Sequence, residues 1–419
     1  MKDDLKICVI GLGYVGAPLL CEIARKYDIC SGFDLSEKRI KELSSLEDST
    51  LELDKDDLKN LSKAELFFNP EKLKNYNFFI VTVPTPVDSE NNPDLSFLES
   101  ASSTLAKHMQ PGSFVVYEST VYPGVTEEVC IPIIEKEGNM QAEKDFYYGY
   151  SPERINPGDK NRSVKDIKKV TSGSSKYAAQ VIDNFYNVII EAGTHLAESV
   201  KIAEASKVVE NAQRDMNIAF VNELSMIFDK LDIDTTEVIK AASSKWNFME
   251  LYPGLVGGHC ISVDPYYLIT KSIKSGHNPE LLGNARKINE GMVDFLIQKA
   301  SNNINKDSSR ANVLVYGLTF KENCKDTRNS KSLNLAKKCK SIFKNVYAHD
   351  DLLLDFDEVD GLVINEDISN DLDIIFSLVN HKTSKKYLLN LINSHKNAIV
   401  VDLKKIFRPG EISNKLIHI

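Results

Sequence analysis

Short apolar runs alternate with helical stretches along the first 150 residues of the chain. Five such runs, each about the length of one strand, lie at 6–10, 29–33, 78–83, 114–117 and 146–150. Strands that are apolar throughout, rather than at every second position, are typical of a parallel sheet covered by helices on both faces. The pattern therefore predicts an α/β domain with a parallel sheet.

A longer apolar pattern follows between about 197 and 231. Apolar residues recur there at helical spacing, and the segment contains neither proline nor glycine. A helix of this length is too long for an ordinary crossover between two strands. We predict a central connecting helix, whose broad apolar surface is a candidate for dimerisation.

The α/β rhythm returns after a polar stretch at 302–310. Its strand-like runs lie at 313–317, 346–348, 374–377 and 398–402. A chain of 419 residues is long enough for two or three domains. The expected parts are an N-terminal domain over 1–196, a central helical region over 197–301 and a C-terminal domain over 302–419.

Composition argues against several classes of protein. The net charge of −9 argues against general binding to nucleic acid, which needs a basic face, although local basic clusters such as Lys321 to Lys331 leave an anionic small ligand open. No apolar run approaches the roughly 18 residues of a membrane-spanning helix, and the first residues are too acidic for a signal peptide. The seven cysteines are irregularly spaced and include no CxxC pair, which favours a reduced cytoplasmic protein without a cysteine-rich zinc site.

The first strand-like run leads directly into a glycine-rich loop. Gly11, Gly13 and Gly16 form GxGxxG, whose glycines permit a tight turn and let backbone N–H groups approach a pyrophosphate at a helix N-terminus. Asp34 closes the second strand 18 residues after Gly16. A carboxylate there accepts hydrogen bonds from a ribose 2′-OH and repels a 2′-phosphate, so we predict NAD rather than NADP. A cap on the following helix is the alternative role of Asp34.

With this loop, the predicted fold class becomes two Rossmann-like α/β domains with parallel sheets, joined by a central helical region that contains the long helix. Thr85 and Thr120 follow two further strands, where ligands of open α/β sheets bind. They are candidate cofactor or substrate contacts, and turn residues that cap the next helices are the alternative. Tyr14, Val15 and Arg39 are further candidate cofactor contacts.

The candidate chemistry centres on Gly257, Gly258 and Cys260, with Asp264 four residues further on. A free cysteine is usually a small core residue, so a nucleophilic thiol is the second interpretation.

Three more residues are candidates for catalysis. Lys207 and Asn211 share one face of the long helix and can stabilise an oxyanion or position a water, although a solvated pair is the alternative. Glu153 follows a strand and is a candidate general base or an ion-pair partner of Arg154.

Taken together, these stretches resemble the UDP-glucose/GDP-mannose dehydrogenase family. The matching motifs, in family order, are GLGYVG (11–16), PTP (84–86), STVYPG (119–124), SPERINPGD (151–159), KVVEN (207–211), GGHCISVDPYYL (257–268) and LTFKENCKDTRNS (318–330). The resemblance implies an N-terminal NAD-binding domain, a C-terminal UDP-sugar-binding domain and a homodimer formed through the central helices.

The resemblance also implies roles for individual residues. Cys260 corresponds to the thiol nucleophile. The residues implied around the reacting sugar C6 are Lys207, Asn211 and Asp264, and those implied to handle water and protons are Thr120 and Glu153. Lys321 is similar to a substrate-contacting lysine, and Arg328 to a residue that meets the cofactor. The other candidate substrate contacts are Arg154, Asn156, Arg214 and Gly257.

The implied reaction is a twofold oxidation of the sugar C6 alcohol to a carboxylate, with NAD as the hydride acceptor. The first oxidation gives an aldehyde, which Cys260 captures as a thiohemiacetal. The second gives a thioester, and water then releases the acid. Covalent capture holds the reactive aldehyde in place. A nearby cation favours the thiolate, and Lys207 is expected to stabilise negative charge on the C6 oxygen.

The cysteine segment also bears on the sugar. A GGSCFxKD segment is typical of the UDP-glucose branch, whereas this chain has GGHCISVDPYYL, with His259 and Val263 at differing positions. This segment and SPERINPGD resemble enzymes that act on UDP-GlcNAc and UDP-GalNAc in bacterial surface-polysaccharide pathways, including capsule and O-antigen. We therefore predict a UDP-N-acetylhexosamine 6-dehydrogenase, with UDP-ManNAc or UDP-glucose as alternative substrates.

Two rival interpretations remain. The β-hydroxyacid dehydrogenases also combine a Rossmann domain, a long helix and a lysine–asparagine pair, but they make one hydride transfer and need no thiol. An NAD-binding scaffold would keep the glycines and has no use for Cys260, Lys207 and Asp264 together. The number of NADH molecules formed per sugar separates the first rival from the thioester route.

Overall fold

The computed structural model describes residues 4–50, 52–88, 90–155, 163–408 and 410–419. The chain forms two compact units: the first unit comprises Met1–Glu210 and Tyr266–His277, and the second comprises Asn211–Pro265 and Asn278–Ile419. Within the described residues, no helix combines the length and the apolar character that crossing a membrane requires.

The first unit contains a six-stranded parallel sheet with the order β3-β2-β1-β4-β5-β6. Its strands are β1 (Ile7–Ile10), β2 (Cys30–Phe33), β3 (Glu65–Phe67), β4 (Phe78–Val81), β5 (Ser113–Tyr117) and β6 (Phe146–Tyr150). This order is that of the dinucleotide-binding Rossmann fold, in which ligands bind where the strand order reverses, here between β1 and β4. The predicted parallel sheet is confirmed, with β3 as a short strand that the apolar pattern did not reveal.

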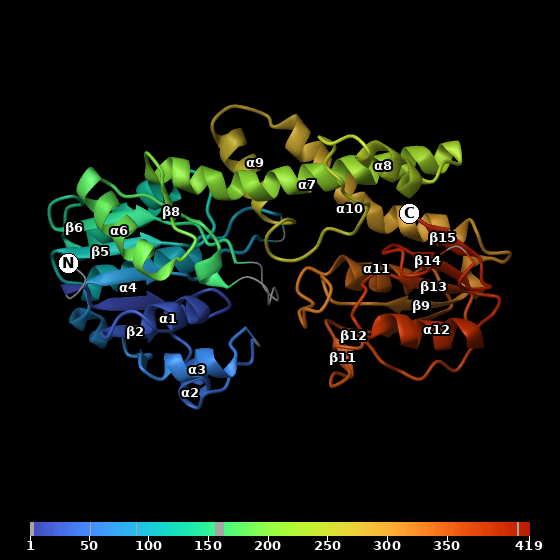
Figure 1. Ribbon diagram of the computed structural model, residues 1–419, viewed down its shortest axis with the longest axis horizontal. Helices are drawn as coiled ribbons and strands as arrows, with labels where there is room; N and C mark the ends of the chain where they lie inside the picture. The colour runs from blue at the N-terminus through green and yellow to red at the C-terminus, as the bar shows by residue number, and fades with distance from the viewer. Residues whose placement is uncertain (1–3, 51, 89, 156–162, 409) are drawn as a thin grey trace. The chain divides into compact units, whose positions relative to one another are not determined.

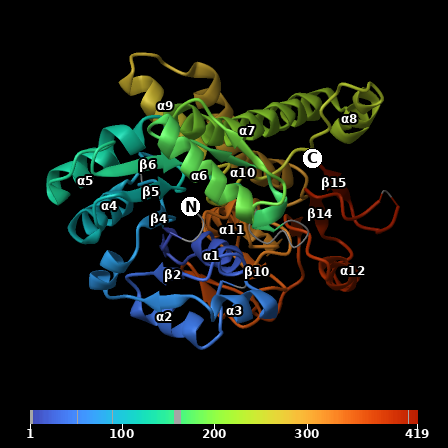
Figure 2. The ribbon, with the colours of Figure 1, turned by 60° about the vertical axis from the view of Figure 1, so that its left-hand side comes forward.

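Helices cover both faces of this sheet. On one face, α1 (Gly16–Ala24) and α6 (Lys176–Ile189) share an apolar core with alternate strand residues such as Val9 and Val116. On the other face, α4 (Ser96–His108) packs beside α5 (Ile131–Gly138) (Figure 2), and the hydroxyl oxygens of Ser102 and Tyr117 lie 2.7 Å apart. The unit also contains α2 (Glu37–Ser44), α3 (Lys55–Leu61), the paired strands β7 (Lys169–Thr171) and β8 (Thr194–Leu196), and single helical turns at Pro70–Asn75, Thr126–Cys130 and Val164–Asp166.

The long helix α7 (Val200–Leu231) begins in the first unit and ends in the second, and it confirms the predicted central helix. Besides its apolar positions, it has a row of buried polar side chains at helical spacing: Glu204, Lys207, Asn211, Asp215 and Asn222. A buried polar group costs stability unless it is paired, so such a row marks a part of the helix with more than a packing role.

The second unit is built on a five-stranded parallel sheet with the order β10-β9-β13-β14-β15. Its strands are β9 (Asn312–Tyr316), β10 (Asn345–His349), β13 (Ile374–Ser377), β14 (Ile399–Asp402) and β15 (Leu416–His418). α10 (Glu280–Ser301) and α11 (Lys331–Cys339) share a core on one face, and α12 (Ser384–Ser394) covers the other (Figure 1). The remaining elements are α8 (Thr235–Ser243), α9 (Asp264–Lys274), which lies mostly in the first unit, the hairpin β11 (Glu358–Val359) and β12 (Leu362–Val363), and a helical turn at Ser308–Arg310.

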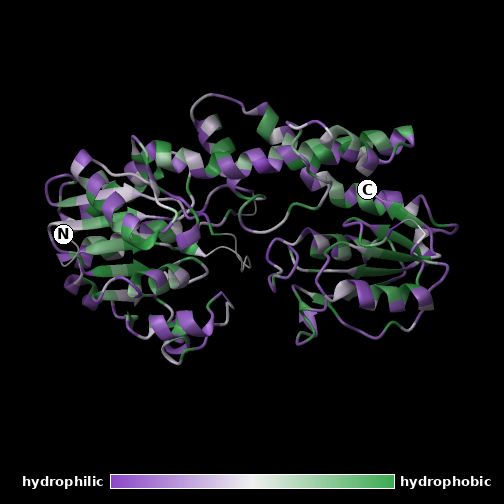
Figure 3. Ribbon diagram, viewed as in Figure 1, coloured by the Kyte–Doolittle hydropathy of each residue, from purple (hydrophilic) through white to green (hydrophobic). Residues whose placement is uncertain are grey.

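Hydropathy follows this layering. The strands of both sheets are largely hydrophobic, whereas the covering helices carry hydrophobic and hydrophilic faces (Figure 3). The two sheets and the helix α7 confirm the predicted fold class of two Rossmann-like domains with a helical region between them in the chain.

Candidate functional site

The glycine-rich loop joins β1 to α1 through a close-packed turn. Gly11 has a φ of +89°, a left-handed conformation that favours glycine, and a Cβ on Gly16 would lie 1.9 Å from the Gly11 carbonyl oxygen. By contrast, a Cβ on Gly13 would meet no atom within 4 Å, so this backbone is accessible to a ligand. A tight turn with an accessible backbone at a helix N-terminus fits the pyrophosphate of a dinucleotide.

Asp34, at the end of β2, braces this loop. Its carboxylate accepts hydrogen bonds from the backbone N–H groups of Leu12 and Ser36, each at 2.8 Å, and the side-chain cap of α2 is Ser36 rather than Asp34. Arg39 donates through Nε to the Leu12 carbonyl oxygen at 2.8 Å and pairs with Asp48 at 2.9 Å. Its Nη2 is buried without a hydrogen-bond partner, so a polar group of a bound dinucleotide would satisfy it.

Two polar loops follow the neighbouring strands β4 and β5. Thr85 and Thr120 are half-buried there, and the Thr85 carbonyl oxygen accepts a hydrogen bond from the Tyr267 hydroxyl at 2.8 Å. The Ser119 hydroxyl donates to the Val83 carbonyl oxygen at 2.6 Å, which ties the two loops together. Both loops therefore lie at the carboxyl edge of the sheet, where this strand order binds ligands.

A buried group of charged side chains lies beyond the ends of β5 and β6. Lys169 donates through Nζ to Glu118 at 2.6 Å and to Glu153 at 3.3 Å. The Tyr186 hydroxyl also donates to Glu118, and the backbone N–H groups of Arg154 and Ile155 donate to Glu153. Glu118, Glu153 and Lys169 are all buried, so these contacts replace water around the charges.

The pKa values of the two carboxyl groups in this cluster shift in opposite directions. Burial raises the pKa of Glu118 to about 7, and the neighbouring Glu153 charge adds to the rise while Lys169 opposes it. Burial acts in the same direction on Glu153, but Lys169, the Ile155 N–H and Lys207 together hold the pKa of Glu153 below its ordinary value. Glu153 is therefore the carboxylate of the pair that stays charged at neutral pH.

Lys207 and Asn211 lie one turn apart on α7, and both side chains are buried rather than solvated. In the second unit, the Asn211 amide donates to the Asp264 carboxylate. The Asp264 N–H in turn donates to the Cys260 carbonyl oxygen at 2.8 Å. Cys260 is half-buried, whereas the other six cysteines are buried.

The backbone of the cysteine loop requires glycine. Gly258 has a φ of +86°, and a Cβ there would lie 2.7 Å from the Phe320 ring. The Asn329 amide donates to the Gly258 carbonyl oxygen at 3.2 Å, and His259 lies 3.1 Å from the Asp326 carboxylate. The segments 257–264 and 318–330 thus pack against each other within the second unit.

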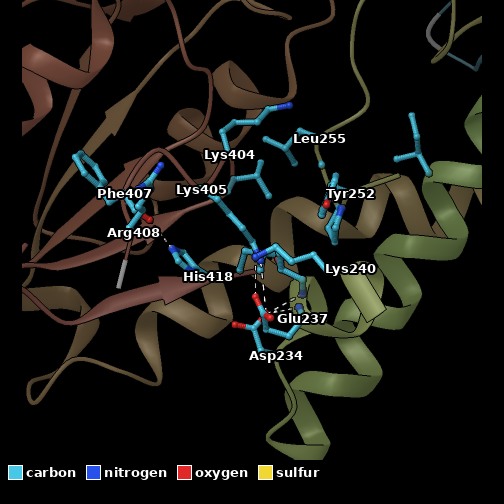
Figure 4. A pocket seen from close by; sticks show the side chains of 16 residues that line it. Asp234, Glu237, Lys240, Tyr252, Leu255, Lys404, Lys405, Phe407, Arg408 and His418 are labelled. Carbon is cyan, nitrogen blue, oxygen red and sulfur yellow. Dashed lines mark hydrogen bonds and ion pairs between the residues drawn. The ribbon is translucent and has the colours of Figure 1, made fainter. Parts of the chain in front are cut away.

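A cavity of about 570 Å³ opens in the second unit beside α8 and the segment that follows β14 (Figure 4). Lys405 Nζ is buried there without a hydrogen bond, 3.8 Å from Asp234, and burial lowers the pKa of Lys405. Lys404 pairs at 4.0 Å with Glu322 of the 318–330 segment, which links the cavity to the cysteine loop. Further lining residues are Lys240, Leu255, Phe407, Arg408 and His418. The lining also includes Glu237, which pairs with Lys240 at 2.7 Å. Cations and apolar side chains in one cavity suit a nucleotide.

Three family models match successive parts of this chain. They describe the NAD binding domain, the central domain and the UDP binding domain of the UDP-glucose/GDP-mannose dehydrogenase family, over residues 5–190, 201–291 and 314–409. The chain belongs to this family. It is therefore an NAD-dependent dehydrogenase of nucleotide sugars, as the motifs predicted. When bound, NAD supplies the hydride acceptor, and the loop at Gly11–Gly16, Asp34 and Arg39 have the geometry to hold it.

Named relatives agree with this membership. The UDP-N-acetyl-D-glucosamine 6-dehydrogenase of Pseudomonas aeruginosa is 51% identical over 339 residues, which are 80% of this chain and 80% of that protein. Protein CapL of Staphylococcus aureus is 45% identical over 417 residues, 97% of each chain. The solved structure of the UDP-D-ManNAc dehydrogenase from Pyrococcus horikoshii aligns with a TM-score of 0.88 and 29% identity, covering 99% of this chain and 98% of that one.

The remaining predicted contacts of this nucleotide-sugar dehydrogenase differ in how they are held. The Arg154 guanidinium donates to the Lys168 carbonyl oxygen at 2.9 Å and pairs with Glu210, whereas Arg214 is exposed on α7. Asn156 lies outside the described residues. The roles of these residues as sugar contacts stay predictions.

Two predicted contacts lie in the 318–330 segment. Lys321 Nζ lies 5.7 Å from the centroid of the Phe320 ring, the same ring that adjoins Gly258. Arg328 pairs with Asp326 at 2.7 Å, next to His259. Both cations are thus close to the cysteine loop, and their predicted ligand contacts stay untested.

Lys169 and Glu204 are among the buried charged residues that the sequence analysis did not single out. Glu204 accepts hydrogen bonds from the N–H groups of Gly124 and Thr126, and burial raises the pKa of Glu204 to about 7. Glu204 lies at helical spacing between the buried Val200 and Val208, at a position where the pattern calls for an apolar side chain. No such local signal marks Lys169, which follows Lys168 in a mixed polar and apolar segment.

Proposed function

We propose that this enzyme oxidises the C6 alcohol of a UDP-N-acetylhexosamine to a carboxylate, with UDP-GlcNAc or UDP-GalNAc as substrate. The observation that carries the proposal is the Cys260 loop, where a half-buried thiol follows two glycines and is joined to the Asn211–Asp264 pair. The GGHCISVDPYYL segment and the relative named as a UDP-N-acetyl-D-glucosamine 6-dehydrogenase support the N-acetylated sugar. The product would be a uronic acid sugar nucleotide for surface polysaccharide, made in the cytoplasm.

In this proposal the C6 alcohol loses a proton and a hydride and becomes an aldehyde. Glu153 accepts the proton, directly or through a water held by Thr120, because it is the carboxylate that stays charged. The Cys260 thiolate then adds to the aldehyde and forms an S–C6 bond. Lys207 and Asn211 stabilise the negative oxygen of this adduct.

Loss of a second hydride, to a second NAD, converts the adduct to a thioester. Water attacks its carbonyl carbon, the S–C6 bond breaks, and the thiolate leaves as the carboxylate forms. Glu153, having released its first proton to solvent, takes a proton from the attacking water. Asp264 acts through Asn211, whose amide it orients.

The cavity of the second unit is our candidate binding site for the uridine diphosphate part of the substrate. Leu255 and Phe407 offer apolar contact to a base, and Lys405, whose buried Nζ makes no hydrogen bond, offers charge to a phosphate. The cavity is linked through the Lys404–Glu322 pair to the segment that holds Lys321.

The test is a count of NADH per sugar. With UDP-GlcNAc, we expect two NADH for each acid formed, and we expect Cys260→Ser to abolish formation of the acid. Cys30→Ser, which changes a buried thiol at the start of β2, is the matched control and should retain both. One NADH per sugar, or full activity in Cys260→Ser, would contradict the thioester mechanism and favour a dehydrogenase that makes a single hydride transfer.

A second candidate substrate is UDP-ManNAc, because the solved relative with a TM-score of 0.88 is named for that sugar. The comparison is kcat/KM for UDP-GlcNAc, UDP-GalNAc, UDP-ManNAc and UDP-glucose. We expect one of the first two to be preferred. A strong preference for UDP-glucose would contradict the N-acetyl assignment.

A further inference from the structure

Glu153, the base in our mechanism, belongs to a buried cluster with Lys169 and Glu118. We propose that Lys169 is a positioning residue for the reaction: anchored by Glu118 and Tyr186, its ammonium group holds the Glu153 carboxylate charged and in one orientation for proton transfer. This inference rests on the proposed function, in which Glu153 accepts the proton.

The contacts leave little freedom to any member of the cluster. The side chains of Lys169 and Glu118 are 4% and 0% exposed, and Lys169 Nζ lies 5.3 Å from the centroid of the Tyr186 ring. Lys169 donates to Oε2 of Glu118, while the Tyr186 hydroxyl donates to Oε1. With both of its oxygens satisfied, Glu118 fixes the lysine in place.

Glu153 is held in the same way. Its Oε2 accepts from Lys169 at 3.3 Å, and its Oε1 accepts from the N–H groups of Arg154 and Ile155. Because the backbone orients one oxygen and the ammonium group the other, the carboxylate has a defined plane. A base must have such a fixed orientation to meet the proton that it removes.

The charges around Glu153 come from four elements. Lys169 on β7 and Lys207 on α7 are cations, Glu118 after β5 is the second carboxyl group, and Tyr186 on α6 is a neutral donor. Two buried carboxylates side by side resist joint ionisation unless cations compensate them. When their surroundings move the pKa values of two neighbouring carboxyl groups in opposite directions, the group with the lower pKa is the one available as a base. Here that group is Glu153.

A purely structural ion pair is the alternative, since losing one partner of a buried pair destabilises a protein whatever its function. The deciding measurement is therefore the pH profile of kcat/KM for NADH formation from UDP-GlcNAc, whose acid limb reports the essential base of the free enzyme. Lys169→Met removes a cation beside Glu153, so the base protonates more easily and the acid limb moves to higher pH by about one unit or more. Lys169→Arg should keep the limb near its wild-type position.

Lys168→Met is the matched control, because this neighbouring lysine is exposed. It should leave the pH profile unchanged. A Lys169→Met enzyme that loses activity equally at every pH, with an unmoved acid limb, would overturn the proposal and leave only a structural pair.

Lys169→Gln tests the same idea and serves if Lys169→Met does not fold. Glutamine keeps an N–H donor for Glu118 and Glu153 but removes the positive charge, so the acid limb should again move to higher pH. An unmoved or lowered limb contradicts the proposal. If the wild-type enzyme reduces NAD with none of the four UDP-sugars, the proposed function itself fails; an active wild type whose variants keep its acid limb refutes the role of Lys169 alone.

Discussion

At the scale of single residues, the exposure of Cys260 separates it from the other six cysteines. Those six are buried, and burial raises the pKa of the thiols of Cys8, Cys130 and Cys339 to about 12. A thiol reacts as its thiolate, so buried thiols of raised pKa are slow nucleophiles.

We predict that iodoacetamide modifies one thiol of the folded enzyme quickly, namely Cys260. Intact mass should show a single adduct that appears in step with the loss of NADH formation, and peptide mapping should find it at Cys260. Bound UDP-sugar should slow the reaction. Fast labelling that persists in Cys260→Ser would contradict the prediction.

Asp34 offers a second prediction at this scale. Its two carboxylate oxygens accept from the N–H groups of Leu12 and Ser36, so Asp34→Asn keeps one of the two acceptors while it removes the charge that repels a 2′-phosphate. We expect the ratio of kcat/KM for NAD to that for NADP to fall by about tenfold, the equivalent of 1.4 kcal/mol.

The control is Glu37→Gln, at an exposed position where α2 begins. It removes one negative charge near the loop without touching the glycine turn. An equal fall of the NAD preference in both variants would mean that the overall field, rather than Asp34 itself, selects the cofactor.

Sequence reasoning identified the thiol, the glycine loop and the Lys207–Asn211 spacing because local patterns encode them. It did not identify Lys169 as a partner of Glu153, because the two residues are 16 positions apart and meet only when β7 returns to the end of β6. Likewise, nothing local shows that Glu204 reaches Gly124, which is 80 positions away. Long-range pairing of buried charges is a property of the fold.

At the scale of elements, α7 combines packing with a polar row. Glu204 anchors the turn at Gly124–Thr126 one helical turn before Lys207, so the helix holds both the STVYPG loop and a candidate catalytic lysine. The apolar spacing predicted this helix, which begins at Val200 rather than near 197. The spacing did not reveal that a row of polar side chains on this helix is also buried. Polar groups can occupy core positions when they are hydrogen-bonded, and the sequence does not show those bonds.

Glu204 makes the stability of this arrangement depend on pH. Its pKa is raised from 4.5 to about 7, so between these values the folded state binds more protons than the unfolded state. The free energy of unfolding therefore declines as pH rises through this window. Glu204→Gln removes this decline.

Urea unfolding at pH 5 and pH 8 measures the effect. The stability of Glu204→Gln relative to wild type should be higher at pH 8 than at pH 5 by of the order of 2 kcal/mol. Glu118, whose pKa is also raised to about 7, is present in both proteins and cancels in the difference. Glu223→Gln, at an exposed position of the same helix, should show no such difference, and an equal effect in both variants would rule out Glu204 as its source.

At the scale of the whole molecule, each of the two large sheets is built from its own succession of strands and helices along the chain. The alternation of apolar runs predicted both parallel sheets, and the GxGxxG loop indicated which of them binds the dinucleotide. The order of the strands could not be predicted from their spacing, because it depends on which side of the first strand each crossover returns. The preferred sugar epimer could not be predicted from the sequence either, because the preference depends on the shape of the substrate site.

Several large apolar side chains remain exposed in the second unit. They are Phe220 (56% exposed), Ile227 (46%), Leu231 (59%), Trp246 (92%) and Met249 (59%). Phe220, Ile227 and Leu231 follow one another along α7 at helical spacing, and α7 is the helix that the sequence predicts as a dimer surface. Exposed apolar patches on this scale are typical of interfaces, so we propose a homodimer that buries this face of α7.

The prediction is that Phe220→Glu and Ile227→Glu shift the enzyme from dimer to monomer. Each change adds a charge to a surface that would be desolvated in the dimer, at a cost of several kcal/mol per buried ion. Light scattering coupled to size-exclusion chromatography, across a hundredfold range of protein concentration, measures the shift. Circular dichroism checks that the helices persist. Lys230→Glu, at an exposed polar position of the same helix, is the control and should leave the mass unchanged. If the wild-type enzyme is a monomer at every concentration, or both glutamate variants remain dimers, the α7 face is not the interface.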